Sequence, residues 1–189
     1  MTGSGRFEPD EGPGASDAQP PQRRLTVDAG SFVISTSRGD VIATGAPVET
    51  GVVVCLTNVA AGLAALLHFA SPDSKANPNE AASQPARFAD TGLELLFEEA
   101  GRHGANAGRS TVRLVGAATV PGDAGSEKVA KRNLLAARSA LWRRGVLLDG
   151  EDVGGTKARR ATLTVEGGQL VVELEEDIAA EHGGTSEQE

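Results

Sequence analysis

Two apolar runs that follow one another, GVVVCLTN at 51–58 and GLAALLHF at 62–69, constrain the fold more than any other part of the chain. Both runs are short and rich in residues that favour strands. Neither shows the alternation of apolar and polar residues that is expected when one face of a strand meets water. The pair therefore predicts strands of a sheet that is buried on both faces.

The segments around these runs predict further strands. RLTVD, SFVISTS and VIATG, between residues 24 and 45, are rich in β-formers and separated by Gly or Asp. Strands are also expected within 110–120 and from residue 145 onward. The segment 159–176 has the form of a hairpin that turns at Gly167 and Gly168.

Two segments, 87–104 and 126–145, repeat apolar residues at three- and four-residue spacing on one face, which is typical of amphipathic helices. The second helix is expected to begin with Ser126 as its N-cap. The segment 71–86 holds three prolines and mostly small polar residues, which predicts a mobile loop. Together these elements predict one α+β domain over residues 24–174.

Acidic residues gather at the two ends of the chain. Residues 1–23 predict a disordered N-terminal tail, and residues 175–189 an acidic C-terminal tail with six acids and no base. The net charge is -8, whereas the segment 24–174 is neutral. This balance argues against binding to nucleic acid or to an anionic membrane. No apolar run reaches the length of a membrane span and no secretory signal is seen, so the cytoplasm is the expected location.

The residues that commonly carry chemistry are few. The histidines, at positions 68, 103 and 182, lack the spacing of metal ligands, and Cys55 is the only cysteine, so neither a metal nor a cofactor is predicted. His68 stands at the end of an apolar run, where an unpaired imidazole is costly, so a partner is expected for it. A core histidine bonded to backbone and a functional base are both open interpretations.

A hairpin that turns at Val59 and Ala60 would set which residues face each other across the two runs. In that register Gly51 faces His68, and Cys55 faces Ala64. Four residues along a strand span ~13 Å, so Cys55 would lie beyond hydrogen-bond reach of His68. Cys55 is therefore predicted to be a packing residue, and Gly51 is the residue expected beside His68.

Several pieces of the chain, in their order, resemble the CheD family, the chemoreceptor glutamine deamidases of bacterial chemotaxis. These pieces are VVVCLTN, ALLHFASP, RFADTGLELLFEEA, KRNLLAARSALWRRGV and EDVGGTKARR, and the resemblance covers about residues 25–172. It implies a layered α/β/β/α fold, a two-sheet core flanked by two principal helices. It also implies hydrolysis of receptor glutamine side chains to glutamate by a cysteine nucleophile, a histidine base and an orienting threonine.

The resemblance assigns His68 to the family's catalytic histidine, and the nucleophile's place, seventeen residues earlier, falls on Gly51. Cys55 matches a second, non-catalytic cysteine. The place of the threonine falls near Gly45, with Thr44 one residue away. Because glycine has no electron pair with which to attack an amide, a catalytically degenerate relative is expected. An active deamidase with an altered nucleophile is the alternative.

The resemblance also implies partners and a substrate site. The partners would be the cytoplasmic domain of a chemoreceptor and a CheC-like phosphatase, with no nucleic acid and no membrane insertion. The glycine loop EDVGGTKARR matches a recurrent family pattern, which makes Asp152, Gly154 and Gly155 candidate substrate-binding residues. Turn geometry explains such glycines as readily as ligand contact does, so both interpretations stay open.

Overall fold

The two apolar runs form antiparallel neighbours, β4 (Val52–Asn58) and β5 (Leu63–Phe69), in the computed structural model, which describes residues 22–177. They lie inside a five-stranded sheet of order β2-β5-β4-β6-β7. Its other strands are β2 (Ser31–Ser35), β6 (Thr111–Gly116) and β7 (Leu148–Val153). Every residue of β5 is buried, as expected for a strand covered on both faces.

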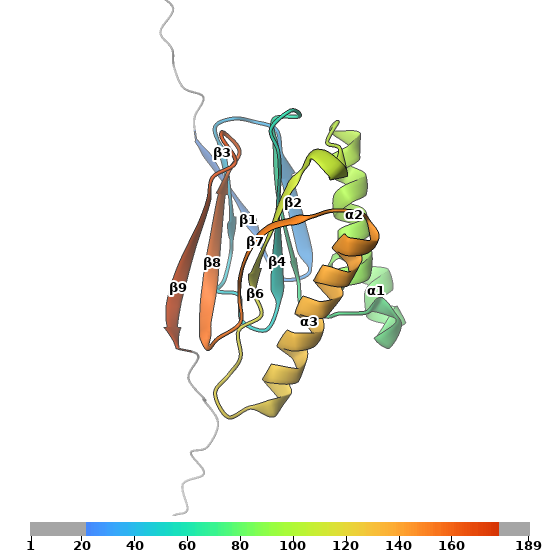
Figure 1. The fold of residues 1–189 in the computed structure, drawn as a ribbon, viewed down its shortest axis with the longest axis vertical. Coiled ribbons are helices and arrows are strands. Elements are labelled where there is room, and N and C mark those ends of the chain that lie inside the picture. Colours follow the sequence, from blue (N-terminus) through green and yellow to red (C-terminus); the bar gives the residue numbers. More distant parts are fainter. Residues whose placement is uncertain (1–21, 178–189) are drawn as a thin grey trace, which may run out of the picture.

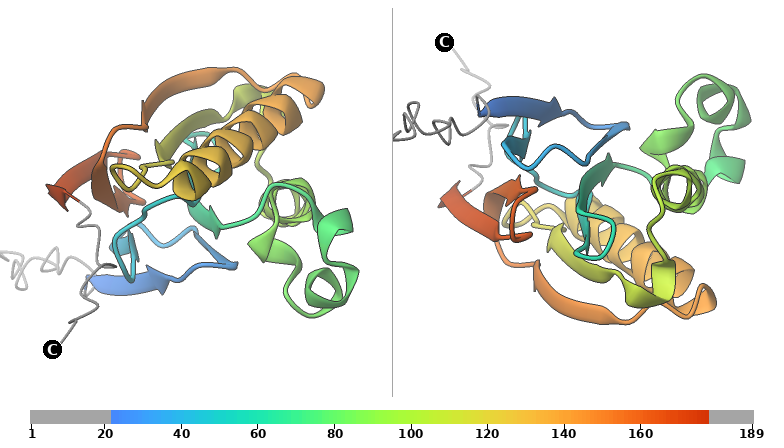
Figure 2. Two further views of the ribbon diagram at one scale, coloured as in Figure 1. Left: turned by 90° about the horizontal axis from the view of Figure 1, so that it is seen from below. Right: turned by 90° about the horizontal axis from the view of Figure 1, so that it is seen from above.

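A second sheet packs against the first (Figures 1 and 2). It has the order β1-β3-β8-β9 and consists of β1 (Arg23–Val27), β3 (Asp40–Thr44), β8 (Lys157–Thr164) and β9 (Leu170–Asp177). The predicted hairpin is present, with Gly167 and Gly168 at φ +73° and +63° in the turn. Strand β9 continues three residues past the boundary expected at 174. The rest of the two predicted tails, 1–21 and 178–189, lies outside the described residues.

The two principal helices, α2 (Ala89–Arg102) and α3 (Ala124–Arg143), both lie on the outer face of the five-stranded sheet (Figure 1). The α+β class with a two-sheet core and two principal helices is therefore confirmed. Within residues 22–177 the layers run four-stranded sheet, five-stranded sheet, helices. The outer face of the four-stranded sheet carries no helix in this range, and β8 alternates buried and partly exposed residues along most of its length, as a sheet facing water does.

Local capping corrects two predictions about the helical segments. Helix α3 begins three residues earlier than predicted, because its N-cap is Asp123, which accepts a hydrogen bond from Gly125 N, and not Ser126. Ser126 is instead buried in the first turn, where its hydroxyl bonds to the backbone of Val120 and Asp123.

The segment 71–86 is not a plain loop, so that prediction was wrong. It folds into η1 (Ser74–Ala76), α1 (Pro78–Ser83) and the start of η2 (Pro85–Arg87), and a further short turn, η3 (Ala107–Arg109), precedes β6. The cap Asp73 accepts from Lys75 N, and Asn77 accepts from Glu80 N. Pro78 occupies the first helical position, where its missing N–H is not needed. No helix in residues 22–177 has the length and apolarity to cross a membrane.

Candidate active site

The register of the central hairpin differs from the predicted one by two residues. His68 faces Val53, and Cys55 faces Leu66. The reason is the turn, which holds four residues, 59–62, between the paired Asn58 and Leu63. A shift of two residues preserves the side-chain alternation of a strand, so each residue keeps its predicted face of the sheet.

Gly51 and His68 nevertheless lie side by side, because Gly51 directly precedes β4 at the end where β5 finishes. A Cβ atom built on Gly51 would lie 2.8 Å from Nε2 of His68 and 3.3 Å from its Cδ2. The same atom would lie 3.0 Å from the carbonyl oxygen of Phe69. A side chain at position 51 would therefore point directly at the imidazole, in the arrangement that a nucleophile and its base require.

His68 is held neutral by its surroundings. The residue is 8% exposed, and burial lowers the pKa of its imidazole from 6.5 to about 4, although the charge of Asp28 acts in the opposite direction. Within residues 22–177 its ring makes no hydrogen bond, so the partner expected from sequence is absent there, and the shift in pKa shows how an unpaired ring is accommodated. A neutral ring nitrogen at pH 7 can accept a proton.

The lowered pKa of His68 predicts an acid-sensitive fold. Because the unfolded chain binds a proton near pH 6.5 and the folded chain only near pH 4, the free energy of unfolding falls as the pH drops through this window. At pH 5 the loss from this residue is expected to be about 2 kcal/mol. Urea unfolding at pH 7, 6 and 5 measures it, with His68→Gln as the control that lacks the titration. Parallel pH profiles for the two proteins would contradict the assignment.

Cys55 is a packing residue, as predicted. It is 3% exposed in the cluster between the two sheets, with Val53 and Leu66 among its members. Burial raises the pKa of its thiol to about 12, so the reactive thiolate is absent at neutral pH.

The place that the resemblance assigns to a threonine is filled by Asp28, the residue that directly follows β1. A Cβ atom on Gly45 would lie only 2.2 Å from Oδ1 of Asp28, so the Asp28 carboxylate occupies the space of a side chain at position 45. Thr44 is buried, and its hydroxyl accepts a hydrogen bond from Ala161 N at 3.2 Å. Asp28, which sequence reasoning missed, is thus the residue whose charge acts on His68.

The backbone around Gly51 is fixed from two sides. Asn133 of α3 is fully buried, and its side-chain amide donates to the carbonyls of Thr50, at 2.9 Å, and Ala70, at 3.0 Å. On the other side Ala117 N donates to the carbonyl of Gly51 at 2.7 Å. Ala117 has a positive φ of 52°, a costly conformation for a non-glycine residue that occurs often at functional sites.

The glycine loop after β7 supports this backbone. Arg159 is 7% exposed and donates to the Asp152 carboxylate at 2.7 Å and to the carbonyl of Gly154 at 2.7 Å. Gly154 N in turn donates to the carbonyl of Gly116, next to Ala117. Gly154 and Gly155 have φ of +80° and +71°, so the turn itself requires glycine. These contacts give Asp152, Gly154 and Gly155 a structural role, and substrate contact by them stays a prediction.

Among the described residues no group of histidine, cysteine and carboxylate side chains is arranged to hold a metal ion.

The chain is similar to known proteins over most of its length. Residues 71–174 match the family described as CheD chemotactic sensory transduction. The chain is 30% identical over 148 residues to a probable chemoreceptor glutamine deamidase CheD of Syntrophus aciditrophicus, which covers 78% of this chain and 92% of that protein. It is 38% identical over 110 residues, 58% of this chain and 65% of the other, to the corresponding protein of Solibacter usitatus. The chemoreceptor glutamine deamidase CheD of Thermotoga maritima is 28% identical over 149 residues, 79% of this chain and 90% of that protein.

Proposed function

The chain belongs to the CheD family, and from that premise we propose that it binds chemoreceptors without deamidating them. The observation that carries the proposal is the position of Gly51. A thiol at this position would lie beside Nε2 of His68, but glycine supplies no nucleophile. In a protease triad the loss of the nucleophile lowers the rate by ~10⁶, so the remaining groups cannot support turnover.

The other residues of the site keep the arrangement expected for a functional protein, which supports a retained binding role. His68 remains neutral and buried, and Asn133 and Ala117 hold the backbone at position 51. Cys55 does not replace the missing thiol, because it is buried between the sheets and its own thiol is protonated at neutral pH. A cytoplasmic protein that binds a receptor's cytoplasmic domain, and by family resemblance a CheC-like phosphatase, is the function that fits these features.

Two measurements on the purified full-length chain test this proposal. The immobilised cytoplasmic domain of a chemoreceptor should retain the chain, while ammonia release from that receptor should not exceed the release seen with boiled protein. Release above that control, abolished by His68→Ala, would establish the alternative of an active deamidase. Failure to retain the chain on receptor and on a CheC-like phosphatase would refute the binding role.

A further inference from the structure

Helix α3 is strongly basic on a chain whose net charge is -8. Glu127 is the only acidic residue within Ala124–Arg143. The basic residues of this helix are Lys128, Lys131, Arg132, Arg138 and Arg143. Positive charge is therefore concentrated on α3, although the chain as a whole is acidic.

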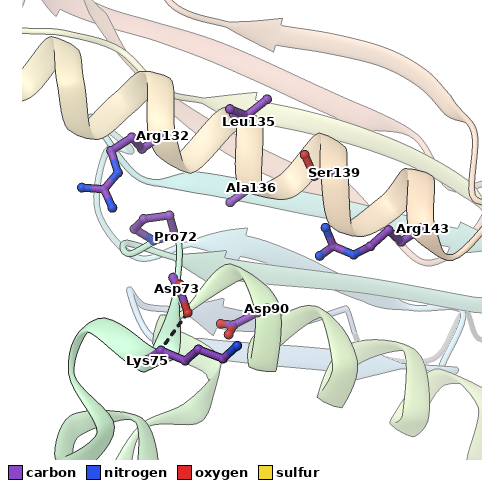
Figure 3. Close-up of a pocket in the computed structure, with 9 residues that line it drawn as sticks. All are labelled: Pro72, Asp73, Lys75, Asp90, Arg132, Leu135, Ala136, Ser139 and Arg143. Carbon is purple, nitrogen blue, oxygen red and sulfur yellow. Dashed lines mark hydrogen bonds between the residues drawn. The ribbon is translucent and has the colours of Figure 1, made fainter.

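Three of these bases, Lys128, Arg132 and Arg143, have no ion-pair partner within residues 22–177. Lys131 bonds to Glu127, and Arg138 pairs with Glu151 at 2.6 Å. Arg132 and Arg143 both line a groove of about 390 Å³. Figure 3 shows their side chains extending from α3 on the side that faces the opposite wall.

The groove has an apolar centre and a mixed opposite wall. Leu135, which is 65% exposed, and Ala136 lie between the two arginines along α3. The far wall carries one base, Lys75, and two acids, Asp73 and Asp90 (Figure 3). Asp90 already accepts hydrogen bonds from Ser74. Trp142, 80% exposed, lies seven residues after Leu135 and so on the same face of α3. Exposed apolar side chains of this size between unpaired charges are typical of a protein-binding surface.

From this arrangement we propose that the groove beside α3 binds an acidic amphipathic helix of a partner protein. Arg132 and Arg143 are eleven residues apart, about three helical turns or ~16 Å, so both can pair with carboxylates on one face of a parallel or antiparallel helix. An apolar residue between those carboxylates would cover Leu135. The carboxylate of Asp73 on the far wall repels the negative charges of a polyphosphate or of a lipid headgroup layer. A helix can instead place a basic or hydroxyl side chain beside this carboxylate.

This inference rests on the proposed binding function but names a surface separate from Gly51 and His68. The groove nevertheless reaches the edge of the site, because Arg132 directly precedes Asn133, and Pro72 lies four residues after His68. A helix in the groove would therefore have one end close to the position 51 side chain of an active relative.

The single tryptophan of the chain gives a readout next to the groove, because Trp142 is exposed and lies two turns after Leu135, which lines it. The probe is a synthetic helical peptide of about 18 residues, or five turns, with two glutamates eleven positions apart and leucine between them. Titration into the full-length chain should shift the Trp142 emission to the blue and protect it from acrylamide, with saturation. The same peptide with both glutamates replaced by lysine should have no effect.

Charge reversal by Arg132→Glu with Arg143→Glu should weaken peptide binding by about tenfold or more, since two attractive pairs become repulsive. Arg132→Gln with Arg143→Gln, which removes charge without adding repulsion, should weaken it less and guards against a folding defect. The matched control is Arg24→Glu with Arg38→Glu, two exposed bases outside the groove that give the same change in net charge.

Several results would overturn the proposal. These are equal binding of the lysine peptide, equal loss in the control variant, or no saturable response to the glutamate peptide. A blue shift with phosphatidylserine vesicles in place of the peptide would assign the surface to a membrane, and a shift with protein concentration alone would assign it to self-association. Because the peptide contains no receptor sequence, its failure would leave the receptor-binding experiment unaffected.

Discussion

Gly51→Cys should convert this chain into a glutamine deamidase. The new thiol would lie beside Nε2 of His68, which is neutral at pH 7 and can take its proton. The thiolate would then attack the amide carbon of a receptor glutamine, ammonia would leave, and water would hydrolyse the thioester to glutamate. Since nucleophile loss in a protease triad lowers the rate by ~10⁶, we expect a gain of about 10³-fold or more over the parent. Ammonia release from a chemoreceptor cytoplasmic domain measures it.

The controls separate the effect of the new thiol from the effect of the steric crowding that any side chain at position 51 causes. The new Cβ atom approaches His68 Nε2 to 2.8 Å and the Phe69 carbonyl to 3.0 Å, so the ring must shift by a few tenths of an ångström. Gly51→Ala imposes the same crowding without a nucleophile and should stay inactive. Gly51→Cys with His68→Ala should also be inactive, because the thiol then lacks its base. Iodoacetamide should label the first variant but not the parent, whose Cys55 is buried. A labelled, folded and inactive Gly51→Cys would refute the idea of an intact site that lacks only its nucleophile.

Asn133→Leu should lower the free energy of unfolding by about 2–4 kcal/mol. The variant removes both hydrogen bonds to the carbonyls of Thr50 and Ala70 and leaves these acceptors without a donor, at about 1–3 kcal/mol each. Urea denaturation at pH 7 measures the loss. Asn79→Leu, an exposed asparagine on α1 that receives the same substitution, should change the free energy by no more than about 0.5 kcal/mol.

Asn133 should also matter for chemistry once a nucleophile is present. In the Gly51→Cys background, Asn133→Leu should reduce deamidation by about 10²-fold, because misplacement of a reacting group by about 1 Å has an effect of this size. The reduction should appear under conditions where the variant is fully folded. An unchanged rate would show that Asn133 stabilises the fold without positioning residue 51.

Sequence reasoning identified the principal helices from their three- and four-residue periodicity, and the central strands from their short, continuous apolar runs. It missed the short helices of 71–86, although Asp73, Asn77 and Pro78 carry capping signals that could have revealed them. The prolines were interpreted as loop formers, whereas Pro78 and Pro85 each occupy a helix start. A proline directly after an N-cap residue begins a helix, so the position of each proline decided the structure, and its presence alone did not predict it.

The site was only partly accessible from the sequence, for a geometric reason. The count of turn residues was wrong, so Val53 rather than Gly51 faces His68, but a two-residue shift keeps both on the same face. Asn133 was missed, although a polar residue among the buried alanines of α3 was a usable signal. Asp28 had no such signal, because only the parallel pairing of β1 with β3, which sets Val27 beside Thr44, brings it to the space beside Gly45.

One turn of α3 serves two surfaces, since Arg132 lines the groove and Asn133 holds the strand ends that flank Gly51. A rigid helix cannot move one of these residues without the other. Thermodynamic linkage then requires reciprocity. If an occupied groove alters the affinity for a ligand beside Gly51 and His68 by some factor, that ligand alters the affinity of the groove by the same factor. The helix thus links a surface that can bind a partner to the backbone that flanks position 51.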